Sequence, residues 1–334
     1  MFGFVFKLLH IISYFVQELI LFGPDIAYCL VLYPHLNKYK SLYEQNVFKH
    51  RIIKKYLLKK YRKVIKPLIE KENIIDGDDT EPYPIWVYWG QGEDSMPALV
   101  RICYNSILKN SNGHTVHLIT DDNYKEYTTI PEYILKKKEK KIISITHFSD
   151  ILRMCLLYEH GGLWLDATVL LTRPLPTIPP LSCSLGFYTP KDNGLATNAL
   201  SGADNWIVRE NRWMTFCIYM NKGNLLADAV KKLFFEYWRK EKKFIEYFLF
   251  DYLIVIAYDC IPEIRIMVDS VPENNPGVHD LQLLLKLKNV YNEALFNELC
   301  SNTYFHKLTY KGDFKEYTPG GKITYYGYLL KQFS

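Results

Sequence analysis

The pattern of apolar residues changes period once within the stretch from residue 149 to residue 168, SDILRMCLLYEHGGLWLDAT. Apolar residues first recur at the spacing of a helix, and they then form the short continuous run that is typical of a buried strand. Gly161 and Gly162 separate the two patterns, and glycine is typical of a helix end. We therefore predict a helix with Ser149 as its N-cap, followed directly by a strand that ends at Asp166.

This helix and strand bring three charged side chains towards one place. Asp150 and Arg153 lie three positions apart near the start of the helix, and residues at that spacing share one face. Asp166 lies at the carboxyl end of the strand, where open α/β sheets have their binding crevice. The pattern alone is equally compatible with a surface ion pair and an aspartate in an ordinary turn.

Alternating strands and helices around this stretch predict an α/β fold with a parallel sheet. The predicted strands are Ile85–Trp89, Thr115–Thr120, Ser184–Thr189 and Trp213–Met220. The predicted helices cover residues 97–109, 225–244 and 247–258. Asp251 interrupts the last of these helices, so its carboxylate is either paired in the core or aimed into a cleft, and the pattern favours neither.

The first 22 residues are apolar around most of a predicted helix, with one narrow polar stripe. That stripe disfavours a membrane-spanning helix, and the lack of a small-residue cleavage site disfavours a signal peptide. Two interpretations remain, a helix packed on the protein's own core and a helix lying in a membrane interface.

A basic amphipathic helix is predicted between Lys49 and Lys66. Anionic lipid attracts each nearby Lys or Arg by about 1 kcal/mol, although a solvated helix face is the common alternative. Together the two helices favour peripheral attachment to the cytoplasmic side of a membrane. Residues 1–80 are therefore predicted to be a membrane-associating helical segment with the start of a linker, Asn73–Pro84, and residues 81–334 to be the main α/β domain.

The composition narrows the class of protein without naming a function. The chain has 334 residues, of which 49% are hydrophobic, enough for one large core or two merged subdomains. Its net charge of +5 comes with locally clustered basic residues and no nucleic-acid motif, so nucleic acid is not an expected partner. Seven cysteines without a C-x-x-C pair predict free thiols in a reducing cytoplasm.

The stretch from Ser149 to Thr168 closely resembles the core of the capsular polysaccharide synthesis glycosyltransferases. These are relatives of glycosyltransferase family 32 and of the glucosylating domains of large clostridial toxins. Their pattern is S-D-x-x-R, a hydrophobic helix, G-G, a hydrophobic strand, and D-x-D or D-A-T. The similarity extends from about Pro84 to about Lys311.

The resemblance implies a GT-A fold, a Rossmann-like mixed sheet with flanking helices, with a nucleotide-sugar half over about residues 84–180 and an acceptor half over about 181–311, followed by a tail. The W-x-Q-G match after the first strand would hold the base and ribose, and a C-terminal His and Lys would close over the diphosphate. The residues assigned in this way to the nucleotide-sugar are Trp89, Gln91, Gly92, Asp150, Arg153, Gly162, Asp166, Ala167, Thr168, His306 and Lys307. The candidate catalytic residues are Asp150, Arg153, Asp166 and Asp251.

A divalent cation, Mn²⁺ or Mg²⁺, is the cofactor that the resemblance implies, with Asp166 and His306 as its candidate ligands. The sequence departs from D-x-D at position 168, where threonine offers a hydroxyl that binds a hard cation less well than a carboxylate. Three outcomes stay open: Asp166 holds the metal with other groups, the metal binds only together with the donor, or lysine and arginine replace it.

By this resemblance the protein transfers one sugar, with retention of configuration, from a nucleotide donor that we expect to be uridine-linked. The expected acceptor is a lipid-linked oligosaccharide of a bacterial capsule or other surface polysaccharide, on the inner face of the plasma membrane. The expected partners are this donor, this acceptor and an anionic membrane surface. Two alternatives stay open: a sugar-phosphate transferase on the same fold, and an inactive relative that acts as a scaffold of the assembly complex.

Overall fold

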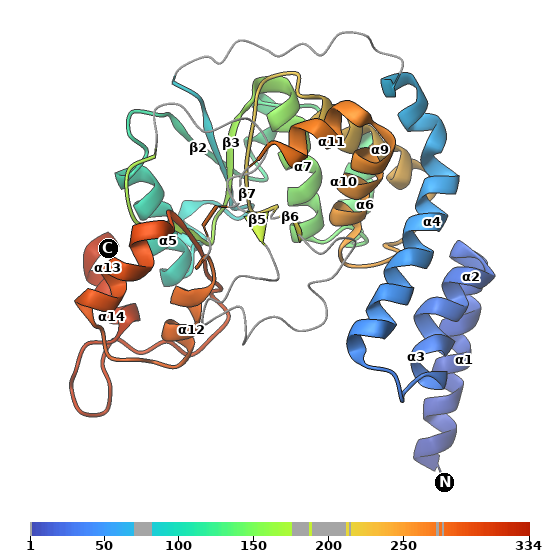
Figure 1. Ribbon diagram of the computed structural model, residues 1–334, viewed down its shortest axis with the longest axis horizontal. Coiled ribbons are helices and arrows are strands. Elements are labelled where there is room, and N and C mark those ends of the chain that lie inside the picture. The colour runs from blue at the N-terminus through green and yellow to red at the C-terminus, as the bar shows by residue number, and fades with distance from the viewer. Residues whose placement is uncertain are drawn as a thin grey trace.

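The computed structural model describes residues 2–69, 82–175, 187–188, 212–213, 215–271, 274–275 and 277–334. Most of the predicted linker Asn73–Pro84 lies outside these ranges. Within them the chain forms a mixed α/β structure, in which helices flank a central sheet and further helices form the N-terminal edge (Figure 1).

The central sheet has four strands in the order β2-β1-β3-β7. β1 (Ile85–Tyr88) runs parallel to both β2 (Val116–Ile119) and β3 (Gly162–Asp166), whereas β7 (Cys217–Met220) is antiparallel to β3. Every residue of β1 is buried, because helices cover both faces of this central strand. Such a strand needs a continuous apolar run, which Ile85–Tyr88 supplies. The sheet is therefore mixed and rich in parallel pairs, as predicted.

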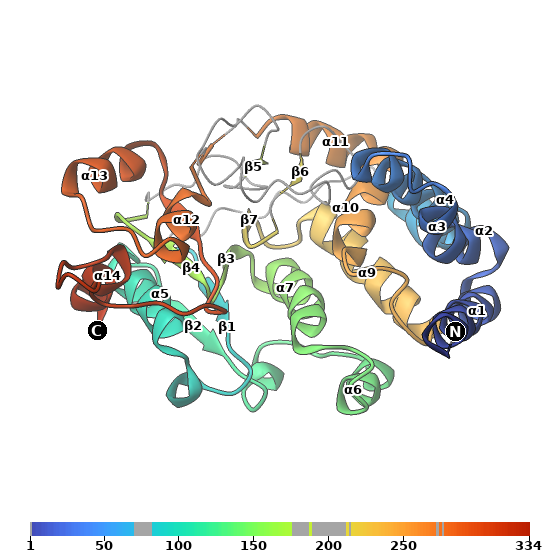
Figure 2. The ribbon, with the colours of Figure 1, turned by 90° about the horizontal axis from the view of Figure 1, so that it is seen from below.

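The helices fall into two groups that lie on either side of the sheet (Figure 2). One group comprises α6 (Glu132–Glu139), α7 (Ile145–His160), α9 (Leu225–Lys240), α10 (Leu249–Cys260) and α11 (Pro262–Asp269). The other comprises α5 (Ala98–Lys109), α12 (Asp280–Lys286), α13 (Glu293–Asn302) and α14 (Tyr325–Phe333). Side chains alternate along each strand, so Trp86 and Trp164 enter the core of the first group, whereas Val87 and Leu165 pack with α5.

Two further strand pairs connect distant segments. β4 (Val169–Leu171) is antiparallel to β8 (Phe305–Lys307), and this pairing places the C-terminal region beside the residues that follow β3. β5 (Phe187–Tyr188) pairs with β6 (Arg212–Trp213). The predicted strand over residues 213–220 is thus two separate strands, β6 and β7.

The N-terminal segment lines one edge of the molecule (Figures 1 and 2). It comprises α1 (Phe2–Phe22), α2 (Pro24–Ala27), a π-helical turn (Tyr28–Leu32), α3 (Tyr33–Leu36) and the long helix α4 (Leu42–Ile69). None of the helices in the described ranges is both long and apolar enough to cross a membrane.

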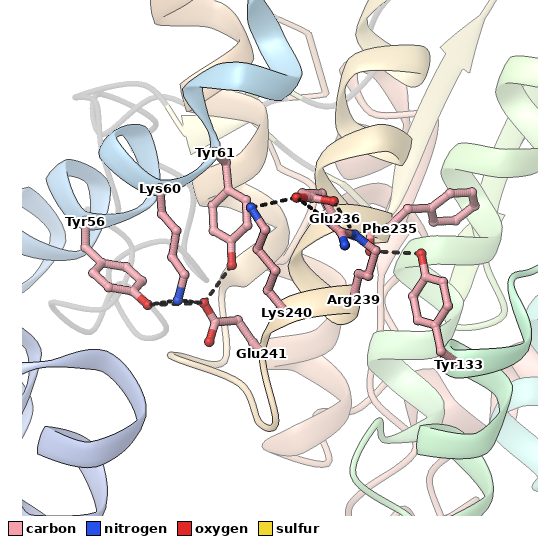
Figure 3. Close-up of polar contacts among 9 residues, drawn as sticks. All are labelled: Tyr56, Lys60, Tyr61, Tyr133, Phe235, Glu236, Arg239, Lys240 and Glu241. Carbon is pink, nitrogen blue, oxygen red and sulfur yellow. Dashed lines mark hydrogen bonds and ion pairs between the residues drawn. The ribbon is translucent and has the colours of Figure 1, made fainter.

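Helix α4 packs its apolar face on the protein's own core, against α9 and α10. The buried residues of this face are Ile53, Leu57, Tyr61 and Ile65. Beside them, the Glu241 carboxylate accepts hydrogen bonds from Tyr61 Oη (2.7 Å) and Tyr56 Oη (3.1 Å) and forms an ion pair with Lys60 (Figure 3). The basic side of the predicted amphipathic helix is therefore the side that α4 exposes.

Helix α1 contacts the rest of the protein along one side only. Glu18 is fully buried and pairs with Lys243, and Phe22 belongs to the same core as α4. The rest of α1 is solvent-exposed and largely apolar, with Phe6 at 71% and Ile20 at 77% exposure, beside the exposed polar residues Lys7, His10, Ser13 and Gln17. The helix thus packs partly on the protein's own core and leaves most of its apolar surface uncovered by the described residues.

Candidate active site

A cavity of ≈ 650 Å³ opens at the carboxyl ends of β1 and β3. Ligands of open α/β sheets bind at this edge, where parallel strands end. The predicted site residues that line the cavity are Trp89, Gln91, Asp150, Arg153, Asp166, Ala167, Thr168, Asp251 and Lys307. Residues from both predicted halves of the catalytic domain therefore surround one space.

Helix α7 carries Asp150 and Arg153, and it begins earlier than the sequence predicts. Its N-cap is Ser144, whose Oγ accepts a hydrogen bond from the backbone N–H of His147 at 3.3 Å. The prediction of Ser149 as the N-cap is wrong, because the buried stripe extends one turn upstream through Phe148. The predicted end of the helix is confirmed, since α7 stops at His160, before the two glycines.

Arg153 joins the two acids of the predicted site. Its Nη2 donates to Asp166 Oδ1 at 2.9 Å, and its Nη1 lies 3.3 Å from Asp150 Oδ1. The guanidinium lies 4.8 Å from the centre of the Trp164 ring, and the side chain is only 4% exposed. The three charged side chains that the sequence predicts to converge are therefore in contact.

Asp166 accepts hydrogen bonds on both carboxylate oxygens. Arg153 and Trp164 Nε1 share Oδ1, each at 2.9 Å, while Lys307 Nζ donates to Oδ2 at 2.7 Å. Lys307 Nζ also donates to Thr168 Oγ1 at 2.7 Å. Burial disfavours the charged form of Asp166, but Lys307 and Arg153 outweigh burial and hold the pKa below its usual value. The carboxylate therefore stays ionised.

Asp150 has the opposite electrostatic balance. Burial raises the pKa of Asp150 to about 7, and Arg153 opposes this rise only in part. The neighbouring charges of Asp166 and Asp251 raise the same pKa further. Asp150 therefore titrates near neutrality, whereas Asp166 does not.

The loop after β1 forms another wall of the cavity through residues 89–91. Beneath it, Tyr88 Oη donates to Asp121 Oδ1 at 2.6 Å, and Lys138 donates to the same oxygen at 2.6 Å. Gly90 lies so close to this pair that a Cβ atom would be 2.7 Å from Tyr88 Oη. The sequence did not predict this support, because Asp121 and Lys138 belong to no motif and meet only in the folded chain.

Two glycines that the resemblance assigns to the nucleotide-sugar lie outside the lining of the cavity. Gly162 begins β3, at the opposite end of the strand from Asp166, where a Cβ atom would lie 2.2 Å from Pro84 O. Gly92 precedes a 3₁₀ turn and has a φ of 83°, a conformation that favours glycine. The backbone therefore requires glycine at position 162, at the end of β3 away from the cavity, and favours it at position 92, whose assignment stays a prediction.

His306 also lies away from the cavity. It is fully buried on β8, and because neighbouring side chains of a strand alternate, Lys307 faces the cavity while His306 faces away. Burial lowers the pKa of His306 to about 3, so the imidazole is neutral. The predicted metal ligands Asp166 and His306 are thus not brought together, and the placement corrects that pairing.

The cavity also has lining residues that the sequence did not predict. Many of them are aromatic, including Phe216, Tyr247, Phe248, Phe250 and Tyr310. Asp251 lies on the same wall, so of its two predicted settings the structure shows the one that faces a cleft. Aromatic residues are common throughout this chain, and no periodicity distinguishes these from core residues.

Comparisons with known proteins place the chain in a family. A search of curated proteins finds no match. A solved structure entitled PaToxG Glycosyltransferase is 13% identical, with a TM-score of 0.35 over 65% of this chain and 83% of that one, too distant to support a conclusion. The model of the capsular polysaccharide synthesis proteins matches residues 35–329, which include every lining residue named above. The chain therefore belongs to the capsular polysaccharide synthesis protein family, as the motif of residues 149–168 predicts, and this membership supports a glycosyltransferase.

Proposed function

We propose that this glycosyltransferase binds a nucleoside-diphosphate-sugar in the cavity and transfers the sugar to a saccharide acceptor in capsule synthesis. The observation that carries the proposal is the state of Arg153. Its side chain is 4% exposed, yet its Nε has no hydrogen-bond partner among the described residues, and its Nη1 has only the 3.3 Å ion pair with Asp150. A buried donor without a partner is unfavourable, so these groups favour an anionic ligand.

The diphosphate is the anion that this site suits best. Arg153 and Lys307 place two cationic groups on the two oxygens of Asp166, at the edge of the cavity. The leaving nucleoside diphosphate gains negative charge as the glycosidic bond breaks, and cations that are fixed in advance stabilise that charge. The cavity of ≈ 650 Å³ also lies within the range of about 300–1,000 Å³ that is usual for ligand pockets.

The nucleoside is proposed to lie along the loop after β1. Trp89 offers an aromatic face to a base. The Tyr310 ring packs edge-on against the Trp89 ring, with the ring centres 5.7 Å apart. The family resemblance favours uridine. In this arrangement the chain has the GT-A organisation, in which the parallel strands carry the nucleotide and the segment after residue 181 carries the acceptor.

The acceptor is proposed to approach from the aromatic wall. Tyr247 and Phe248 supply flat apolar surfaces that suit sugar rings, and Asp251 supplies a carboxylate beside them. The glycosyltransferases that this sequence resembles retain the anomeric configuration, so we propose front-face transfer. The acceptor oxygen bonds to the anomeric carbon as the bond to the diphosphate breaks, and the acceptor proton passes to a leaving phosphate oxygen.

A lipid-linked acceptor is supported by the N-terminal edge. The exposed side of α4 is basic, with Arg51, Lys55, Lys59, Arg62, Lys63 and Lys66 all exposed. The exposed side of the neighbouring α1 is largely apolar. Cationic and apolar surfaces together suit an anionic bilayer, so we propose peripheral attachment to the inner face of a bacterial plasma membrane.

Donor turnover tests the proposed function. The purified full chain is incubated with UDP- and GDP-sugars, and the released nucleoside diphosphate is measured for the wild type and for Asp166→Asn. We expect a loss of at least about 100-fold in the variant, because Asp166 orients both cations. Asp259→Asn is the matched control, since Asp259 forms a partly exposed ion pair with Lys54 on α4.

The same assay separates the alternatives. Full turnover by Asp166→Asn contradicts the assignment of the site. A product that carries the phosphate with the sugar, detected by its mass, indicates a sugar-phosphate transferase. Absence of both binding and turnover with every donor, in a folded wild-type protein, indicates a scaffold.

A further inference from the structure

We infer that the Lys307 ammonium takes the place of the divalent cation that D-x-D transferases use, so that this site binds a nucleoside diphosphate without a metal. The inference rests on the proposed function and extends it to the chemistry of the leaving group. Lys307 Nζ donates to Asp166 Oδ2 and to Thr168 Oγ1, each at 2.7 Å. Asp166 and Thr168 occupy the first and third positions of the D-A-T motif, which correspond to the two aspartates of D-x-D.

The oxygen ligands that a metal requires are already engaged. A hard divalent cation takes about six oxygen ligands, with carboxylates preferred. Asp166 accepts three hydrogen bonds from cationic or N–H donors, and Thr168 offers only a hydroxyl that Lys307 already occupies. Among the residues that the structure describes, no three His, Cys, Asp or Glu side chains are grouped to hold a metal ion.

Electrostatics disfavour a second cation at the same carboxylate. A metal bound to Asp166 Oδ2 at about 2.1 Å would lie at most about 5 Å from Lys307 Nζ, which is 2.7 Å from that oxygen. The repulsion would be strong in a partly buried site, where charges are poorly screened. The donor set of this site therefore does not fit the divalent cation that the resemblance implies.

The fold fixes Lys307 in this position. β8 pairs with β4 so that Lys307 lies opposite Val169, directly after the motif, and the backbone N–H of Leu308 donates to Thr168 O at 2.9 Å. The ammonium also lies 5.3 Å from the centre of the Phe216 ring. The lysine is thus held by strand pairing beside the motif, and its side chain remains 23% exposed towards the cavity.

In the proposed reaction Lys307 and Arg153 act on the leaving group. The bond between the anomeric carbon and the β-phosphate oxygen breaks, and its electron pair stays on that oxygen. Lys307 and Arg153 donate hydrogen bonds to the diphosphate as this charge develops, which is the role that a metal has in D-x-D enzymes. The proton of the acceptor hydroxyl leaves with the diphosphate, so no metal and no further reactant is required.

Calorimetric titration with UDP and GDP, in EDTA and in MnCl₂, tests this inference. We expect the wild type to bind its preferred diphosphate with affinities that agree within about twofold in the two buffers. Lys307→Met should bind at least about tenfold more weakly in both buffers. The control Lys315→Met, at an exposed lysine paired with Asp313, should bind like the wild type.

A double variant gives the converse test. Thr168→Asp with Lys307→Ala restores the second carboxylate and removes the ammonium, so its binding should become dependent on Mn²⁺. Circular dichroism confirms that each variant is folded. Wild-type binding that requires Mn²⁺ overturns the inference and leaves the proposed function intact, whereas a folded wild type that binds neither diphosphate in either buffer overturns the proposed function itself.

Discussion

Arg153 Nη2 lies 2.9 Å from Asp166 Oδ1, and this contact joins helix α7 to the end of the strand that follows it. The two residues are only 13 positions apart, yet the helix must end at Gly161 and the chain reverse before they meet. Because Arg153 also contacts Asp150, one guanidinium sets the position of both acids.

The first prediction concerns Arg153 itself. Arg153→Lys keeps the positive charge but lacks the forked donors that reach two carboxylates, so UDP affinity should fall by at least about tenfold. Arg153→Ala should lower the free energy of unfolding by about 3 kcal/mol, because it leaves buried acids without their partner. Calorimetry and urea unfolding measure the two effects. Arg239→Lys, in an exposed pair with Glu236, is the control, and unchanged UDP binding by Arg153→Lys would contradict the assignment.

The second prediction follows from Asp150, whose pKa burial raises from 3.8 to about 7. Between these values the folded protein holds a proton that the unfolded chain has released, so this group contributes stability at low pH and loses it as the pH rises through about 7. Asp150→Asn does not titrate. Its melting temperature relative to the wild type should therefore rise between about pH 5 and about pH 8.

Thermal melts of both proteins across that range measure the difference. Asp259→Asn is again the control, because Asp259 lies outside the cavity lining and pairs with Lys54. If the difference in melting temperature between Asp150→Asn and the wild type does not change with pH, Asp150 does not titrate in this range.

The third prediction separates two glycines. Gly90→Ala places a Cβ atom 2.7 Å from Tyr88 Oη, which disturbs the hydrogen bond to Asp121 beneath the cavity wall. Gly162→Ala places a Cβ atom 2.2 Å from Pro84 O at a φ of 95°. Gly90→Ala should therefore weaken UDP binding with little loss of stability, whereas Gly162→Ala should lower stability by more than about 1 kcal/mol. A Gly162→Ala variant with lower UDP affinity and unchanged stability would instead support the resemblance-based assignment of Gly162 to the nucleotide-sugar.

The fourth prediction concerns the membrane. Replacing Lys55, Lys59 and Lys63 by Gln removes three exposed charges from α4, each worth about 1 kcal/mol at an anionic surface. Binding to vesicles that contain phosphatidylglycerol should fall by about 100-fold, and added salt should weaken wild-type binding. Flotation assays measure both.

The control for this experiment replaces Lys136, Lys140 and Lys141, which are exposed at the end of α6. It should bind vesicles like the wild type. An equal loss of vesicle binding in both triple variants would indicate a general effect of net charge. A wild-type protein that does not bind these vesicles would contradict the proposed membrane attachment.

The sequence by itself determined the helix, the glycine turn and the strand around residues 149–168, the parallel part of the sheet and the family. The helix, the turn and the strand depend on contacts between near neighbours in the chain, whose periods and end residues are visible in one dimension. The parallel sheet was predicted from the alternation of strands and helices, although its strands pair across long stretches of sequence, such as Ile85 with Leu163. For the same reason Asp150, Arg153 and Asp166 were predicted to meet.

Only the tertiary structure decided which residue of the pair His306 and Lys307 faces the site. That choice depends on the pairing of β8 with β4, and Lys307 reaches Asp166 across 141 positions of sequence. A shift of the β8–β4 pairing by one residue would exchange the positions of the two side chains. The local sequence does not determine this register. The same holds for α4, whose apolar face follows a helical period but whose partner, the protein's own core at α9 and α10, is fixed by long-range packing.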